Sequence, residues 1–289
     1  MLPGMRSVLL AASLLLALPA FADTTAGAHY RAGVAFKNQG KYDEAIAEFE
    51  ATVAQKPDHG MAWNSLGLLY RLRERHEKAL IAFENASKLM PKSAPVWGNL
   101  GMAYWRADRP SDALKALELA AKLDPKEPLY QENMGVIKRK TGDAEGAVKH
   151  LEAAVKLKPN DPQTVSNLGT AYSGVKRLDD AARTYRKAIT LSPKIAEFHF
   201  NLATVLRRQE KVDEAIQEYL EAVKYDEKMA PAWYDLGVMY RTNKENELAV
   251  EAFQKYLDLT HGKDAKADEA VQTEIDALGG SKAPKKKTK

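Results

Sequence analysis

The side chains best suited to bind another molecule are four asparagines that recur at one fixed interval along the chain. A carboxamide offers two N–H donors and a carbonyl acceptor, so it can pair with both the N–H and the C=O of an extended peptide. A row of carboxamides on one surface would therefore bind backbone and demand little of the bound sequence. This candidate row consists of Asn99, Asn133, Asn167 and Asn201.

Apolar and basic side chains accompany the asparagines at the same interval. Met102 and Val136 each follow an asparagine by three residues and could hold apolar groups of a partner. Basic residues come next, where they could attract acidic side chains. They could also offset the dipole at a helix C-terminus, which is worth about 0.3–1 kcal/mol. Both explanations for basic residues at these places stay open. The candidate basic residues are Arg106, Arg139, Lys140, Arg207 and Arg208.

Signatures of catalysis are missing from the sequence. It contains no G-x-x-x-x-G-K-[ST] phosphate loop, no H-E-x-x-H motif and no G-x-G-x-x-G after a strand pattern. Cysteine is absent, which excludes disulfides, thiol catalysis and thiolate metal sites. His29 and His199 fall where other units carry tryptophan, so we expect them to be packing residues. The sequence therefore predicts a protein that is not an enzyme and that uses no metal and no cofactor.

The charge distribution argues against nucleic acid as a partner. The net charge is +4, but the last nine residues carry five lysines and no acid, so residues 23–280 are slightly acidic. Nucleic-acid-binding proteins carry a basic face on the fold itself. We expect residues 281–289 to form a disordered Lys-rich tail.

Residues 1–22 have the pattern of a signal peptide. One basic residue is followed by an apolar stretch from Val8 to Leu18, then by Pro19 and by Ala20-Phe21-Ala22, the small-residue pattern of a cleavage site. Because a helix rises only about 1.5 Å per residue, these eleven residues span about half of a bilayer core, which favours a cleaved signal over a permanent anchor. We expect cleavage after Ala22, no stable membrane anchor and a periplasmic or secreted bacterial protein. An uncleaved anchor is the alternative.

The 34-residue interval between the asparagines organises most of the chain. After a short linker at 23–25, the twentieth place of every unit is alanine, and the eighth is glycine in all units but the sixth, which has Ala203. Small residues allow two helices to approach closely, and proline near the end of five units prevents the second helix from continuing. Each unit therefore predicts a pair of antiparallel helices. The seven units are 26–59, 60–93, 94–127, 128–161, 162–195, 196–229 and 230–263.

Three segments match the pattern W-x2-L-G-x2-Y, at Trp63 to Tyr70, Trp97 to Tyr104 and Trp233 to Tyr240. The chain thus resembles the tetratricopeptide repeat (TPR) family. The resemblance implies an all-α solenoid of seven repeats that forms a right-handed superhelix, with the first helix of each pair lining a concave channel. An apolar stripe at 264–280 predicts a helix that caps the last repeat.

The resemblance also implies that the asparagine, apolar and basic candidates face the channel. The asparagines are similar to the ladder in the repeats of O-linked N-acetylglucosamine transferases, although asparagine is common at this place in the family. The clamp of the chaperone-tail-binding members is not matched, since Tyr30, Asn64 and Gly98 stand where its lysine would begin. The fifth repeat has small or uncharged channel residues beside aromatic ones, which predicts a notch formed by Gln163, Ser166, Thr170, Ser173 and Gly174 between Trp105, Phe200 and Tyr234.

These observations predict an adaptor that binds an extended segment of a partner protein, in the bacterial envelope. Two alternatives stay open. The chain could carry a non-protein ligand, such as a glycan or a lipid tail, in the notch of the fifth repeat. It could also be a non-catalytic subunit of an envelope enzyme complex.

Overall fold

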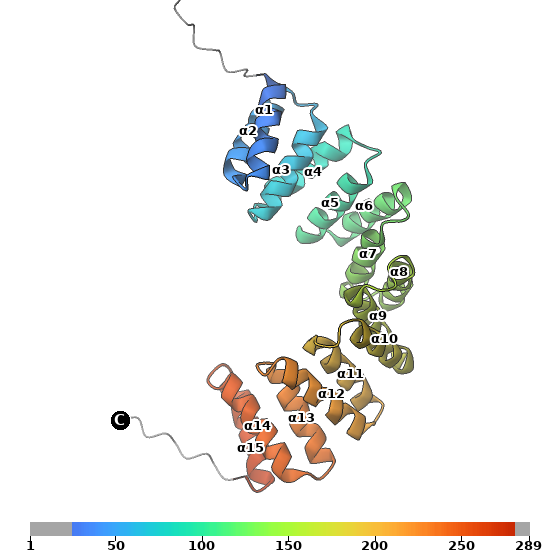
Figure 1. The fold of residues 1–289 in the computed structure, drawn as a ribbon, viewed down its shortest axis with the longest axis vertical. Coiled ribbons are helices and arrows are strands. Elements are labelled where there is room, and N and C mark those ends of the chain that lie inside the picture. The colour runs from blue at the N-terminus through green and yellow to red at the C-terminus, as the bar shows by residue number, and fades with distance from the viewer. Residues whose placement is uncertain (1–24, 281–289) are drawn as a thin grey trace, which may run out of the picture. The chain divides into compact units, whose positions relative to one another are not determined.

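A computed structural model describes residues 25–280, which form fifteen α-helices (Figure 1). The all-α prediction is confirmed. The expected signal peptide at 1–22 and the Lys-rich tail at 281–289 lie outside the described residues. The helices are α1 (Ala26–Asn38), α2 (Tyr42–Gln55), α3 (Gly60–Leu72), α4 (His76–Leu89), α5 (Ala94–Arg106), α6 (Pro110–Leu123), α7 (Pro128–Lys140), α8 (Ala144–Leu157), α9 (Pro162–Gly174), α10 (Leu178–Leu191), α11 (Ala196–Arg208), α12 (Val212–Tyr225), α13 (Ala230–Thr242), α14 (Asn246–Thr260) and α15 (Ala265–Ala277).

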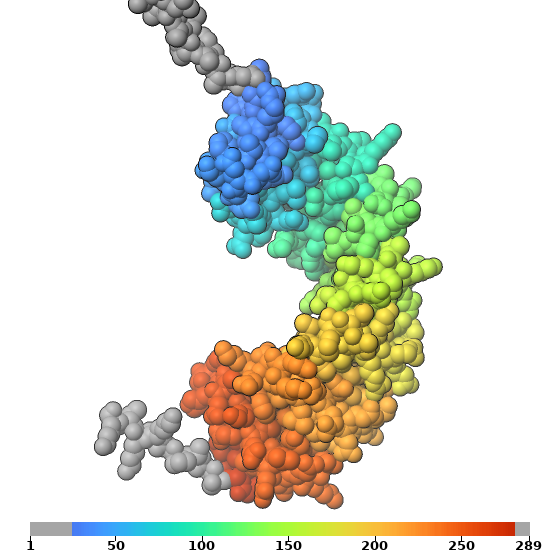
Figure 2. Space-filling model, in the orientation of Figure 1, coloured from blue at the N-terminus to red at the C-terminus, as the bar shows by residue number. Residues whose placement is uncertain are grey.

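The helices form two compact units, and each is built from helical hairpins. The first unit ends at Pro91 and includes α1 to α4, and the second begins at Lys92 and includes α5 to α15. Within the second unit the later helix of each hairpin packs against the first helix of the next, as α8 does against α9. In Figure 2 the colours of the second unit run in chain order from one end of the unit to the other. We call the first helix of each hairpin its A helix and the second its B helix.

Each hairpin closes on a contact between small residues, as in the fourth repeat. Ala147 of α8 is fully buried, and a β-carbon added to Gly135 of α7 would lie 2.6 Å from Cγ of Leu151. The two helices are therefore already in van der Waals contact through the glycine backbone. This close approach is the packing that the small eighth and twentieth places predict.

The turn inside every hairpin uses a left-handed residue, a feature the sequence analysis missed. The fifteenth residue of each repeat has a positive φ, between 56° and 90°. Only two of the seven are glycine, so five turns hold a side chain in a conformation that L-residues disfavour. These residues are Gly40, Glu74, Asp108, Gly142, Lys176, Glu210 and Lys244.

A ring N–H near the start of the A helix ties two repeats to the turn before it. Nε1 of Trp63 donates to the Pro57 carbonyl at 2.8 Å, and Nε1 of Trp233 donates to the Glu227 carbonyl at 3.0 Å. His199 is buried and places its Nε2 2.9 Å from the Pro193 carbonyl. It thus makes the same contact as the tryptophans, which agrees with a packing role.

Helix α15 covers the end of the array. Its buried residues Val271 and Ile275 join the apolar core of the last three repeats, and Glu274 pairs with Arg241 of α13. A helix in this position shields the apolar side of α14 as a further repeat would. Among residues 25–280, none of the helices is long and apolar enough to cross a membrane.

Candidate protein-binding surface

The predicted binding residues lie on the A helices of the second unit. We call the surface of α5, α7, α9, α11 and α13 that carries them the A-helix face. Neighbouring A helices contact one another, as α7 contacts α9. The four asparagines are all half-buried, so each has part of its side chain open to solvent, one on each of α5, α7, α9 and α11.

The asparagines differ in what they already bind. Asn133 and Asn201 make no hydrogen bond within residues 25–280, and Asn99 does have a polar contact. Nδ2 of Asn167 donates to Oε1 of Glu132 at 2.8 Å, while its Oδ1 accepts from Gln163 at 3.3 Å. Asn167 therefore joins the fourth and fifth repeats, and the row of available carboxamides is interrupted there.

The apolar candidates give way to polar groups along the same face. Met102 and Val136 are half-buried, but the equivalent residues of the next two repeats are threonines. The hydroxyl of Thr170 lies 2.9 Å from that of Tyr185, and Thr204 lies 3.3 Å from Tyr219 in the same way. Burial raises the pKa of both tyrosines to about 12, so they are neutral near pH 7. The face is apolar at the third and fourth repeats and hydroxyl-rich at the fifth and sixth.

Two of the basic candidates are engaged by neighbouring repeats. Nη1 of Arg208 donates to the carbonyl and the hydroxyl of Ser173, at 3.0 and 2.6 Å. Arg207 lies 3.8 Å from Asp235 of the seventh repeat. Both arginines thus bridge repeats.

The other three basic candidates are open. Arg106 and Lys140 are exposed and Arg139 is half-buried, and none of them makes an ion pair within the described part of the chain. The positive charge of Arg139 acts on Tyr185 and partly opposes the increase in the pKa of that phenol caused by burial. The unpaired positive charge of this face therefore lies at the third and fourth repeats.

The predicted notch in the fifth repeat is partly filled. Ser166 is buried, and Ser173 is covered by the Arg208 guanidinium. A β-carbon added to Gly174 would meet no atom within 4 Å, and Tyr234 is 39% exposed. Trp105 and Phe200 are half-buried and pack against the apolar core.

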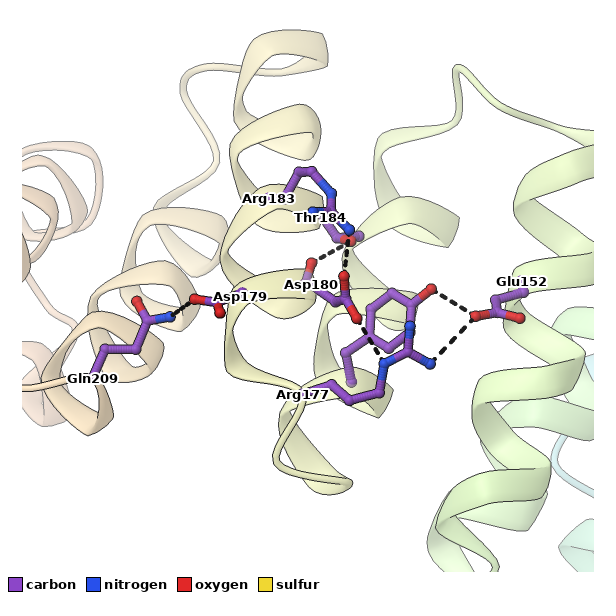
Figure 3. Close-up of polar contacts among 8 residues, drawn as sticks. Glu152, Arg177, Asp179, Asp180, Arg183, Thr184 and Gln209 are labelled. Carbon is purple, nitrogen blue, oxygen red and sulfur yellow. Dashed lines mark hydrogen bonds and ion pairs between the residues drawn. The ribbon is translucent and has the colours of Figure 1, made fainter.

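A polar network on the B-helix side fixes the spacing of the fourth, fifth and sixth repeats (Figure 3). The Tyr172 hydroxyl donates to Glu152 at 2.7 Å, and the Arg177 guanidinium lies 4.4 Å from the Tyr172 ring. Nε of Arg177 donates to Asp180 at 2.6 Å, and Gln209 donates to Asp179 at 2.7 Å. Contacts between successive repeats hold the A helices, and so the candidate residues, in place.

Sequence reasoning missed the tyrosine hydroxyls and Glu132. The tyrosines could have been found from the sequence. The twenty-fourth place of a repeat is Tyr only in the fifth and sixth repeats, which are also the two repeats with Thr at the ninth place, whereas the other repeats have Phe or Leu at the twenty-fourth place. Glu132 had no such signal, since one more carboxylate on a helix suggests only a solvated position. The described residues contain no group of three or more His, Asp or Glu side chains placed to hold a metal ion.

Comparison with known proteins places the chain in a family. A family model described as the C-terminal domain of cilia and flagella-associated protein 70 matches residues 9–231, and one described as a tetratricopeptide repeat matches residues 218–264. No curated protein matches the sequence.

Solved structures share the fold at low identity. A TPR protein from Cytophaga hutchinsonii has a TM-score of 0.70 at 18% identity, over 83% of this chain and 98% of that one. PilF of Pseudomonas aeruginosa has a TM-score of 0.62 at 20% identity, over 74% and 97%. YrrB, titled a TPR protein with an unusual peptide-binding site, has a TM-score of 0.56 at 20% identity, over 66% and 98%. Because the first family model covers more than half of the chain and the second is the repeat itself, this chain belongs to the tetratricopeptide repeat family.

Proposed function

We propose that this protein is a non-catalytic adaptor that binds an extended segment of a partner protein on its A-helix face. The observation that carries this proposal is the state of Asn133 and Asn201. Both are half-buried on one face and make no hydrogen bond within residues 25–280. An amide in this position can pair with a peptide backbone without first breaking a bond inside the protein.

The surroundings of Asn133 suggest what the bound segment contains. Val136 and Met102 offer apolar surface, and Arg106, Arg139 and Lys140 supply positive charge without ion-pair partners in the described residues. An extended segment with apolar and acidic residues fits this part of the face. Its association should weaken as salt rises, because the attraction to exposed lysine and arginine is screened.

The proposed setting is the bacterial envelope. The signal-peptide pattern of residues 1–22 and the absence of cysteine support a periplasmic or secreted protein that acquires stability without disulfides. The partner is then another exported protein, or the part of an envelope protein that faces the same compartment.

The experiment uses a photo-crosslinking residue at position 136 in the otherwise intact protein, expressed in its own host. We expect covalent adducts with a partner, and far fewer adducts in the same background carrying Asn133→Ala and Asn201→Ala. The matched control places the crosslinker at Lys187, which is exposed on the B helix α10. Equal adducts from positions 136 and 187, or adducts unaffected by the alanine pair, would contradict binding at the A-helix face.

A further inference from the structure

A cavity of about 280 Å³ is lined by α12, the end of α13 and the start of α14. Its lining includes two carboxylates, Asp213 and Glu245, and no lysine, arginine or histidine. The other lining residues are Ile216, Gln217, Leu220, Tyr240, Asn243 and Leu248. Pockets for whole small molecules measure about 300–1,000 Å³, so this cavity suits one or two side chains. It combines negative charge with apolar surface.

The two carboxylates share one neutral donor. Nδ2 of Asn243 lies 3.5 Å from Oδ1 of Asp213 and also donates to Oε1 of Glu245. Neither carboxylate makes an ion pair within residues 25–280. In the second repeat the equivalent places hold Arg73 and Arg75, which pair with the equivalent aspartate at 2.6 and 3.8 Å. At the last junction between repeats, an amide and a further carboxylate thus replace the two arginines.

The surroundings of the cavity do not restore the missing positive charge. An adjacent hollow at the first turn of α14 has Lys244 as the cation of its lining, against Glu245 and Glu247. The linings of the two hollows together carry three carboxylates and one lysine, a net charge of −2. Lys211 and Glu251 are the next charges along α12 and α14, and they offset one another. A positively charged group would therefore be attracted to this place.

Tyr240 presents an unpartnered hydroxyl to the cavity. The residue is only 9% exposed, and its hydroxyl makes no hydrogen bond within residues 25–280. The equivalent hydroxyl of Tyr172 donates to Glu152 at 2.7 Å, but Leu220 takes the place of that glutamate beside Tyr240. Burial and the nearby carboxylates raise the pKa of Tyr240, so the hydroxyl stays a donor. A ligand that fits should bring a hydrogen-bond acceptor as well as positive charge.

The described chain ends beside the helix that lines this cavity. A β-carbon built on Gly280 would lie 3.0 Å from Cγ1 of Val250, which follows Leu248 by two residues on α14. Because a helix with its side chains is about 10–12 Å across, the cavity lies about one helix width from Gly280. Five residues of extended chain span about 17 Å. The consecutive lysines at 285–287 are therefore within reach of the cavity.

We propose that the Lys-rich tail at 281–289 docks in this cavity of its own chain. The ammonium group of a lysine at 285–287 would lie between Asp213 and Glu245, and a backbone carbonyl of the tail would accept from Tyr240. The tail carries five lysines and no acidic side chain, which complements the negative lining. A short tether gives an effective concentration on the order of millimolar, so even a weak contact would be occupied.

Docking would change what the charge of the tail can do. Its lysines would be balanced by carboxylates of the fold, and they would not be offered to nucleic acid or to an anionic membrane. The tail would also join α12 to α14 at the last junction between repeats. This contact uses the B helices, so it does not depend on binding at the A-helix face.

The test places a photo-crosslinking residue at Thr288 of the otherwise intact, purified protein, which keeps all five lysines of the tail. We expect adducts within one chain, mapped by mass spectrometry to segments 213–220 and 240–248, with a yield that does not depend on protein concentration. Adducts of twice the chain mass that increase with concentration would show that the tail binds another copy. Adducts spread over the surface would show that it does not dock. Either result overturns the proposal.

Neutral variants separate this cavity from a general attraction to an acidic protein. Asp213→Asn combined with Glu245→Gln should lower the adduct yield at least about fivefold, because the ammonium group loses both charged partners. The matched control combines Glu227→Gln with Asp258→Asn, which removes the same charge near the other ends of α12 and α14 and should leave the yield unchanged. Circular dichroism checks that both proteins fold. Equal yields from the two double variants would overturn docking at this cavity.

Discussion

Nδ2 of Asn167 donates to Oε1 of Glu132 at 2.8 Å, across the junction between the fourth and fifth repeats. The other carboxylate oxygen of Glu132 lies 3.0 Å from the hydroxyl of Thr164. One side chain of α7 thus holds two of α9, and one candidate binding residue is used for cohesion between repeats.

Removing this carboxylate should loosen the junction. Glu132→Ala leaves the amide of Asn167 without its acceptor, whereas the hydroxyl of Thr164 can still donate to Asp161 at 2.9 Å. Hydrogen bonds to charged groups contribute about 1.5–3 kcal/mol. Because the site is partly open to water, we expect a loss of about 1–2 kcal/mol in the free energy of unfolding, measured by urea denaturation. The control is Glu118→Ala, which removes an exposed glutamate of α6 and should change stability by less than about 0.5 kcal/mol. Equal effects of the two variants would contradict the bridging role.

Asp161 should make the stability of the fifth repeat depend on pH. It caps α9 by accepting from the Thr164 N–H at 2.8 Å and pairs with Lys158 at 2.7 Å. Its interactions with Lys158 and then with the Thr164 N–H lower its pKa to about 2. Because the folded pKa lies below the unfolded value near 3.9, the stabilisation is fully present above about pH 5 and is lost as the pH falls toward 2.

The variant Asp161→Asn keeps a capping acceptor and removes the titration. We expect it to be about 1–2 kcal/mol less stable than the wild type at pH 7, and we expect most of this difference to be lost near pH 2, where Asp161 is about half protonated in the folded protein. Urea denaturation at a series of pH values measures the difference. A difference that does not vary between pH 6 and pH 2 would show that the charge of Asp161 contributes nothing.

The left-handed residues predict substitutions that stabilise the protein. Lys176 has a φ of 61° in an exposed turn, a conformation that glycine adopts without steric cost. Lys176→Gly should raise the free energy of unfolding by about 0.5–1 kcal/mol. Lys187→Gly, in the interior of α10, should lower it by about 1 kcal/mol, so the same change has opposite signs at the two sites. Thermal denaturation of both variants measures these changes. A loss of stability in Lys176→Gly would show that the left-handed conformation of Lys176 costs no stability.

A larger side chain at Ala147 should destabilise the hairpin of the fourth repeat. Ala147 is fully buried opposite Gly135, where no added carbon fits without displacing Leu151. Ala147→Leu should cost about 1–3 kcal/mol and, because stability in an array depends on neighbouring repeats, should separate unfolding into more than one step. Ala47→Leu, at an exposed position of α2, is the control. A single transition at the wild-type temperature would be inconsistent with this contact.

The proposed export also has a direct test. Ala22→Asp should block cleavage after residue 22, since a charged residue does not satisfy the small-residue requirement of the site. Mass spectrometry of the protein from cell fractions should find a wild-type chain that begins at Asp23 and a variant that retains Met1. A wild-type chain that also retains Met1 would exclude the signal peptide.

The all-α architecture of helical hairpins could be predicted from the sequence, whereas the binding face could be predicted only in outline. Gly135 and Ala147 are required by the distance between two helices, so their spacing reveals the hairpin. Asn133 and Asn167 look identical in the sequence, yet Asn133 makes no hydrogen bond within residues 25–280 whereas Asn167 is held by Glu132. That difference arises from a side chain of the neighbouring repeat, and no regular spacing marks it. The role of Arg208 was hidden for the same reason, because its acceptors are on Ser173 of the preceding repeat.

The left-handed turns bear on how such a chain can change length during evolution. Every repeat carries its own chain reversal at the same place. Equivalent contacts between repeats recur at the same sequence separation, as the hydrogen bonds of Tyr70 to Glu50 and of Tyr172 to Glu152 do. A duplication or deletion equal in length to one whole repeat therefore preserves the phase of all helices and turns, wherever its end points fall. An insertion of any other length inside a helix shifts the left-handed residue away from its turn. Genes for proteins of this architecture should accordingly gain and lose material in whole repeats, and the number of adjacent surfaces offered to partners should change by integers.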